Sequence, residues 1–114
     1  MNKRTCQHSS TDKITHVLYL PSLCPVSKNP LTGSYIAITY NPTSGLVLDV
    51  DLLAEQILSY KDGSKTGTRD METTIQELTE FAALRTEARV SSVAVLKIST
   101  SPKTEQLMIV RCAR

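Results

Sequence analysis

The sequence predicts an α+β domain in which two helices cover one face of a four-stranded antiparallel sheet. Apolar and polar residues alternate in two segments near the beginning of the chain and in two near its end, as is typical of half-buried strands. Between these pairs, apolar residues recur every three or four positions, as is typical of amphipathic helices. A sheet with one apolar face must bury that face, so we expect both helices on the same side of it.

The first two strands are predicted at 14–20 and 34–40, because both segments are rich in β-branched and aromatic residues at alternating positions. The connection 21–33 contains three prolines and one glycine, which excludes a strand or a helix and indicates an ordered loop. The polar residues 1–13 lack such a pattern. We expect them to form a flexible tail before a single domain that spans 14–114.

The two helices are predicted at 50–60 and 69–88, where apolar residues form a stripe at helical spacing. Asp70 and Glu72 suit the beginning of the second helix, because a carboxylate is favourable at the positive end of the helix dipole. Thr68 or Asp70 is expected to be the N-cap.

The last two strands are predicted at 90–99 and 106–112, and the short connection between them favours an antiparallel hairpin. The predicted order is therefore strand, strand, helix, helix, strand, strand. Such a sheet has two edge strands, whose unpaired backbone groups can pair with another copy of the chain.

Composition and charge exclude several classes of protein. The 114 residues include 13 Lys and Arg and 11 Asp and Glu, for a formal net charge of +2, and the basic residues are scattered along the sequence rather than clustered as in a nucleic-acid-binding protein. The three cysteines have no paired spacing, which argues against a disulfide framework. No apolar run approaches the roughly 20 residues of a membrane span, and the first residues are not a signal peptide. We therefore expect a cytoplasmic protein with free thiols and no membrane partner.

One short segment points to chemistry. Cys24 lies in SLCPVSKNP, residues 22–30, which leads directly into the alternating segment SYIAITYNP. The first segment resembles the active-site segment of the 7-cyano-7-deazaguanine reductase family. It is similar also to the archaeal amidinotransferases, which act on the same nitrile carried on transfer RNA, and more distantly to type IB GTP cyclohydrolases.

The order of elements resembles that of the tunnelling fold, or T-fold, to which these enzymes belong. In that fold the protomers join edge to edge into a β-barrel, and the active sites lie between subunits. The resemblance thus implies a homo-oligomer that binds a purine- or pterin-like small molecule at its subunit interfaces, in the metabolism of 7-deazapurines such as queuosine. Transfer RNA is an alternative carrier of the substrate.

The resemblance gives Cys24 the role of a nucleophile. In the reductases a thiolate adds to the nitrile carbon to form a thioimide, which two hydride transfers from NADPH convert to an amine; in the amidinotransferases ammonia displaces the thiol. A nucleophilic thiol needs a lowered pKa and a fixed position. We expect Lys28 to lie close enough to favour the thiolate, and Ser27 to donate a hydrogen bond to it.

The resemblance also implies that a carboxylate near the start of the second helix anchors the ring of the substrate. The matching residue is Glu72, with Asp70 as the alternative, because a carboxylate can accept two hydrogen bonds from an N–H/NH₂ edge. The sequence departs from the reductases at three places. Leu31 stands where they have a proton-donating aspartate, 49–60 lacks the lysines of their NADPH motif, and 69–72, Arg-Asp-Met-Glu, lacks their His-Glu pair. The sequence therefore assigns no cofactor.

Each candidate residue also has a simpler interpretation. Cys24 can be a small apolar loop residue, or a metal ligand with His16, although His16 is better explained as a strand residue. Asp70 and Glu72 can serve only the helix dipole and the cap. Two alternative functions follow: a non-catalytic T-fold protein for binding or assembly, and a pterin-directed enzyme related to the type IB GTP cyclohydrolases.

Overall fold

The computed structural model describes residues 2–3, 12–63, 70–100 and 104–114. The main sheet consists of β2 (Ile14–Tyr19), β3 (Tyr35–Tyr40), β5 (Val90–Thr100) and β6 (Thr104–Ala113). The helices are α1 (Val50–Leu58) and α2 (Met71–Thr86), with a 3₁₀ turn at Lys61–Gly63. Two short strands, β1 (Asn2–Lys3) and β4 (Leu46–Val47), pair with each other. Most of the predicted tail, including Cys6 and His8, lies outside the described residues, as do Thr68 and the tip of the last hairpin.

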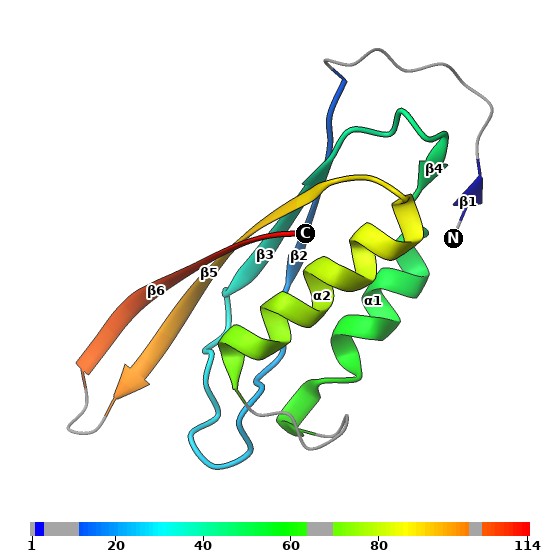
Figure 1. The fold of residues 1–114 in the computed structure, drawn as a ribbon. Coiled ribbons are helices and arrows are strands. Elements are labelled where there is room, and N and C mark those ends of the chain that lie inside the picture. The colour runs from blue at the N-terminus through cyan, green and yellow to red at the C-terminus, as the bar shows by residue number, and fades with distance from the viewer. Residues whose placement is uncertain (1, 4–11, 64–69, 101–103) are drawn as a thin grey trace.

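The main sheet is antiparallel throughout, with the strand order β2-β3-β5-β6. Both helices lie on one face of it (Figure 1). The predicted fold class, an α+β arrangement of four antiparallel strands and two helices, is confirmed. The strands β5 and β6 are longer than β2 and β3, so their hairpin extends beyond the other two strands (Figure 1).

The core lies between the sheet and the helices. Alternate residues of β3 point toward the helices and are buried, namely Ile36, Ile38 and Tyr40. Leu53 and Ile57 of α1 and Ile75, Leu78 and Ala82 of α2 are buried against them. A period of two in the strands and of about 3.6 in the helices thus places the apolar residues of both layers in one core.

A buried tyrosine connects the two helices. Tyr60 follows α1, and its hydroxyl donates a hydrogen bond of 2.6 Å to Oε1 of Glu77 in α2. Burial, together with the nearby Glu77 carboxylate, raises the pKa of Tyr60 to about 12. The hydroxyl therefore stays protonated and keeps donating at every physiological pH.

The opposite face of the sheet has no helix over it among the described residues. Its exposed apolar side chains lie on the two edge strands: Val17 and Tyr19 on β2, and Leu107 and Ile109 on β6. No described helix is both long enough and apolar enough to cross a membrane.

Candidate functional site

The loop that carries Cys24 is held by hydrogen bonds at both of its ends. Leu23 and Cys24 donate their backbone N–H groups to the backbone oxygen of Asn29, at 2.8 and 3.1 Å. The Asn29 side chain is 7% exposed and pairs with the backbone of Ser99 in β5, donating to its oxygen and accepting from its N–H, both at 2.9 Å. Asn29 thus fastens the loop to the sheet as an additional strand residue would.

The far end of the loop is fastened to β5 in a similar way. Leu31 donates its backbone N–H to the Lys97 oxygen at 2.7 Å, and Lys97 donates its own N–H to the buried Ser34 hydroxyl at 2.8 Å. That hydroxyl in turn donates to the Leu31 oxygen at 2.8 Å. The prediction of an ordered loop is therefore confirmed.

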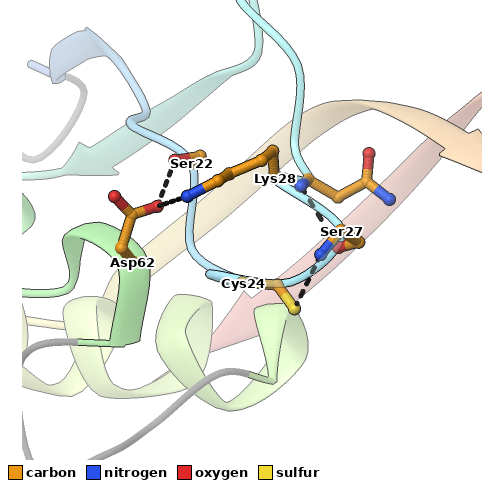
Figure 2. A network of polar contacts seen from close by, with 6 residues as sticks. Ser22, Cys24, Ser27, Lys28 and Asp62 are labelled. Carbon is orange, nitrogen blue, oxygen red and sulfur yellow. Dashed lines mark hydrogen bonds and ion pairs between the residues drawn. The ribbon is translucent and has the colours of Figure 1, made fainter.

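The Cys24 thiol is partly exposed at the tip of this loop. The backbone N–H of Ser27 points to Sγ, with a nitrogen–sulfur distance of 3.5 Å (Figure 2). The Ser27 hydroxyl instead accepts a hydrogen bond from the backbone N–H of Asn29 at 3.3 Å. Ser27 does face the sulfur as expected, but the donor is its backbone rather than its side chain.

Lys28 points to a carboxylate on another segment. Its ammonium nitrogen lies 3.8 Å from Oδ1 of Asp62, on the turn that follows α1, and in Figure 2 it is directed away from the thiol of Cys24. Ser22 donates its hydroxyl to the same Asp62 oxygen at 2.6 Å, and Asp62 donates its N–H to the Ser22 oxygen at 2.8 Å. The structure thus joins Ser22, Lys28 and Asp62 on one side of the loop and places the thiol on the other.

Asp70 and Glu72 lie at the start of α2, which is drawn beside the Cys24 loop in both views (Figures 1 and 2). Asp70 is the N-cap, as one of the two expected candidates, and its Oδ1 accepts from the N–H groups of Glu72 and Thr73 at 2.9 and 3.4 Å. Glu72 is exposed in the first turn. With one carboxylate engaged in capping, Glu72 is better placed than Asp70 to meet a ligand.

The two carboxyl groups influence each other. A hydrogen bond with Glu72 lowers the pKa of Asp70, helped by the N–H groups that its carboxylate caps. The same hydrogen bond, together with the negative charge of Asp70, raises the pKa of Glu72. As the pH falls, Glu72 therefore takes up a proton before Asp70 does.

A cavity of about 590 Å³ lies beside the loop. Its wall is formed by the end of β2 and by the two ends of the loop, and includes Tyr19, Ser22, Lys28 and Leu31. Cys24 is not among the described residues that line it. The thiol and the cavity are thus two separate features of one loop.

The chain does not fit NADPH at the place where the resemblance puts it. Asp49 occupies the N-terminus of α1 with its own carboxylate, which accepts from the N–H groups of Asp51 and Leu52 at 2.9 and 3.2 Å. Asp51 adds a second negative charge in the first turn, and the helix has no lysine. A 2′-phosphate would be repelled there, so no step is derived through NADPH.

Metal ligands are not gathered in the part of the chain that the structure describes. No group of three His, Cys, Asp or Glu side chains that could hold a metal ion occurs in these residues. His16 contacts Tyr40, with 3.0 Å between its Nε2 and the tyrosine hydroxyl.

Sequence reasoning missed Asp62, Ser22 and Asn29. Asp62 and Ser22 are 40 residues apart, and Asn29 and Ser99 are 70 apart, so no local pattern connects them. A signal for Asp62 did exist: it precedes Gly63 in a turn, and Asp tolerates the left-handed conformation with φ of 52° that it adopts.

Comparison with known proteins adds no relative. No family model, no curated protein and no solved structure matches the chain. The likeness to the deazaguanine reductases rests on the segment 22–30 and on the order of the elements.

Proposed function

We propose that this protein is a T-fold enzyme that acts on the nitrile of a 7-deazaguanine-type ring through a Cys24 thioimide, in the manner of the 7-cyano-7-deazaguanine reductases or the amidinotransferases. The observation that carries the proposal is a partly exposed thiol on a loop fastened at both ends, with a backbone N–H group directed at its sulfur. Fixed position and hydrogen bonding of this kind are what a nucleophilic thiol requires.

The first step follows from this geometry. The Cys24 thiol loses its proton to water, the thiolate adds to the nitrile carbon, one C–N π bond is lost, a C–S bond forms, and the nitrogen takes up a proton from water to give the thioimide. The Ser27 N–H group is directed at the sulfur and can donate a hydrogen bond to the thiolate. Lys28, directed at Asp62, has no assigned part in this step.

Glu72 supports the recognition of the ring. Its exposed carboxylate lies in the first turn of α2 and can accept two hydrogen bonds from the N–H and NH₂ groups of a guanine-like edge. Asp70 is the weaker alternative, since its carboxylate already caps the helix.

A second copy of the chain would complete the site. The sheet ends on one side with β2 and on the other with β6, and each of these strands has one neighbour in the sheet. Pairing β2 of one copy with β6 of the next would continue the antiparallel sheet and lead to the barrel of the T-fold. The Cys24 loop follows β2 directly, so such a junction would put the loop next to a neighbouring subunit.

The alternative is a non-catalytic binding or assembly protein, or a pterin-directed enzyme, on the same fold. The absence of Cys24 from the described residues that line the cavity favours the binding protein.

The test is the intact mass of the protein after incubation with 7-cyano-7-deazaguanine. We expect an added mass equal to one whole ligand in the native protein and in Cys112→Ala, and none in Cys24→Ala. Cys112 is a suitable control because it is the other cysteine among the described residues and is also partly exposed. An unmodified native protein would refute the thioimide and leave the binding protein as the better reading.

A further inference from the structure

The cavity beside the loop has the size of a ligand site in its own right. About 590 Å³ lies within the range of small-molecule pockets in proteins. Much of its wall is apolar: Pro21, Pro30, Leu31, and the ring of Tyr19, which is 75% exposed. An exposed aromatic ring in a pocket wall offers a surface on which a planar ligand can stack.

The cavity has one charged group in its wall. Of the nine residues that line it, all within the described part of the chain, Lys28 alone is charged. Its side chain is 63% exposed and its ion pair with Asp62 is long, at 3.8 Å, so the ammonium can reach another anion at little cost. The Asp62 carboxylate would keep the hydrogen bond of the Ser22 hydroxyl at 2.6 Å.

A second ammonium lies next to the wall. Gly33 lines the cavity, and a Cβ added there would come within 2.7 Å of the Lys97 ammonium nitrogen. The backbone also places Lys28 in the left-handed region, with φ of 61°. This left-handed conformation is uncommon for residues other than glycine, asparagine and aspartate, and residues that adopt it cluster at ligand sites.

We propose that this cavity binds a planar small molecule that carries an anionic group, either a phosphate or a carboxylate. The ring lies against Tyr19 and the two prolines, and the anion replaces Asp62 as the ion-pair partner of the Lys28 ammonium. This inference does not rest on the proposed function, because the cavity wall does not include Cys24.

The test compares pairs of probes that share a ring and differ in whether they carry an anionic group, by isothermal titration calorimetry on the full chain. Guanosine 5′-monophosphate against guanosine tests the phosphate, nicotinate against nicotinamide tests the carboxylate, and inorganic phosphate tests the anion without a ring. We expect the anionic member of at least one pair to bind about tenfold more tightly than its neutral partner. The pair that shows the difference identifies the anion. Equal affinity within both pairs, or inorganic phosphate binding as tightly as the nucleotide, would overturn the proposal.

Substitutions at Lys28 and at Asp62 should act in opposite directions. Lys28→Met should remove the preference for the anionic probe. Lys28→Gly should remove it as well, and glycine adopts the left-handed backbone at this position without strain, so this variant tests the same charge with less risk of unfolding. Asp62→Asn should tighten binding several-fold, since it removes the competing anion and keeps an oxygen for Ser22. Lys61→Met and Glu55→Gln are the matched controls for charge at exposed positions outside the cavity.

Cys24→Ala separates this proposal from the proposed enzyme. It should abolish the covalent adduct with the nitrile and leave the affinity for the anionic probe unchanged. Lost probe affinity in Cys24→Ala, or unchanged affinity in both Lys28 variants, would show that the ligand does not occupy this cavity.

Discussion

His16 has a well-defined role at the scale of single residues. Its ring stacks on Tyr40 with 5.6 Å between the ring centroids, and its Nε2 lies 3.0 Å from the Tyr40 hydroxyl. That hydroxyl accepts a hydrogen bond from the Leu48 N–H at 3.0 Å, which leaves its own proton for Nε2. The arrangement is satisfied when His16 is neutral. Burial favours the same form and lowers the pKa of His16 below its ordinary value of 6.5.

Stability should therefore fall in mildly acidic solution. A lowered pKa means that the unfolded chain binds the proton more readily, so the contribution of His16 is fully present above pH 6.5. It is lost as the pH drops from 6.5 through the folded-state pKa. Urea unfolding at pH 7.5 and pH 5 checks this, with His16→Gln as the control, since its side-chain oxygen can still accept from Tyr40. An equal loss in both proteins would contradict the role given to His16.

At the scale of elements, the loop 21–33 depends on one buried side chain. Asn29→Ala removes two hydrogen bonds to Ser99 at the end of β5, and each such bond is worth about 0.5–1.5 kcal/mol. We expect the free energy of unfolding to fall by about 1–3 kcal/mol, and the Cys24 thiol to react faster with a thiol reagent as the loop loosens. Thiol labelling of Asn29→Ala against native protein, at neutral pH, measures the second effect.

The control for this loop is Thr15→Ala, which removes an exposed hydrogen bond to Thr39 between two strands. It should change stability by less than about 0.5 kcal/mol and leave the labelling rate of Cys24 unchanged. If Asn29→Ala behaves like Thr15→Ala, the loop is held by its other contacts.

The elements themselves were largely predictable, because each depends on a local pattern. Alternation predicted the strand that the structure has at Tyr35–Tyr40, and the capping preference of aspartate identified Asp70 as one of two candidates for the N-cap of α2. The candidate site was less predictable. Spacing placed Lys28 four residues from Cys24, but its direction is set by Asp62, which is distant in sequence. Contacts of that kind depend on how the layers pack, and single-sequence patterns do not contain them.

At the scale of the whole molecule, charge is unevenly divided between the two layers. Nine of the 11 acidic residues lie between Asp49 and Glu87, in the segment that contains the helices, whereas the four strands of the main sheet contain only Glu105. The open sheet face therefore combines exposed apolar side chains with little negative charge. A face of this composition favours contact with other chains over isolation in water.

Edge pairing between copies makes a specific prediction about this face. If β2 of one copy pairs with β6 of the next in a register that aligns their open faces, Val17 of the first strand lies beside Leu107 or Ile109 of the second. Such apolar pairs stabilise a sheet. A charge placed among them would have to be buried without a partner, which is strongly unfavourable.

Light scattering after gel filtration should thus show an oligomer for the native chain and a smaller species for Val17→Glu. Leu84→Glu, at an exposed apolar position of α2, should keep the native mass. A monomeric native chain at micromolar concentration would contradict edge pairing and, with it, an active site shared between subunits.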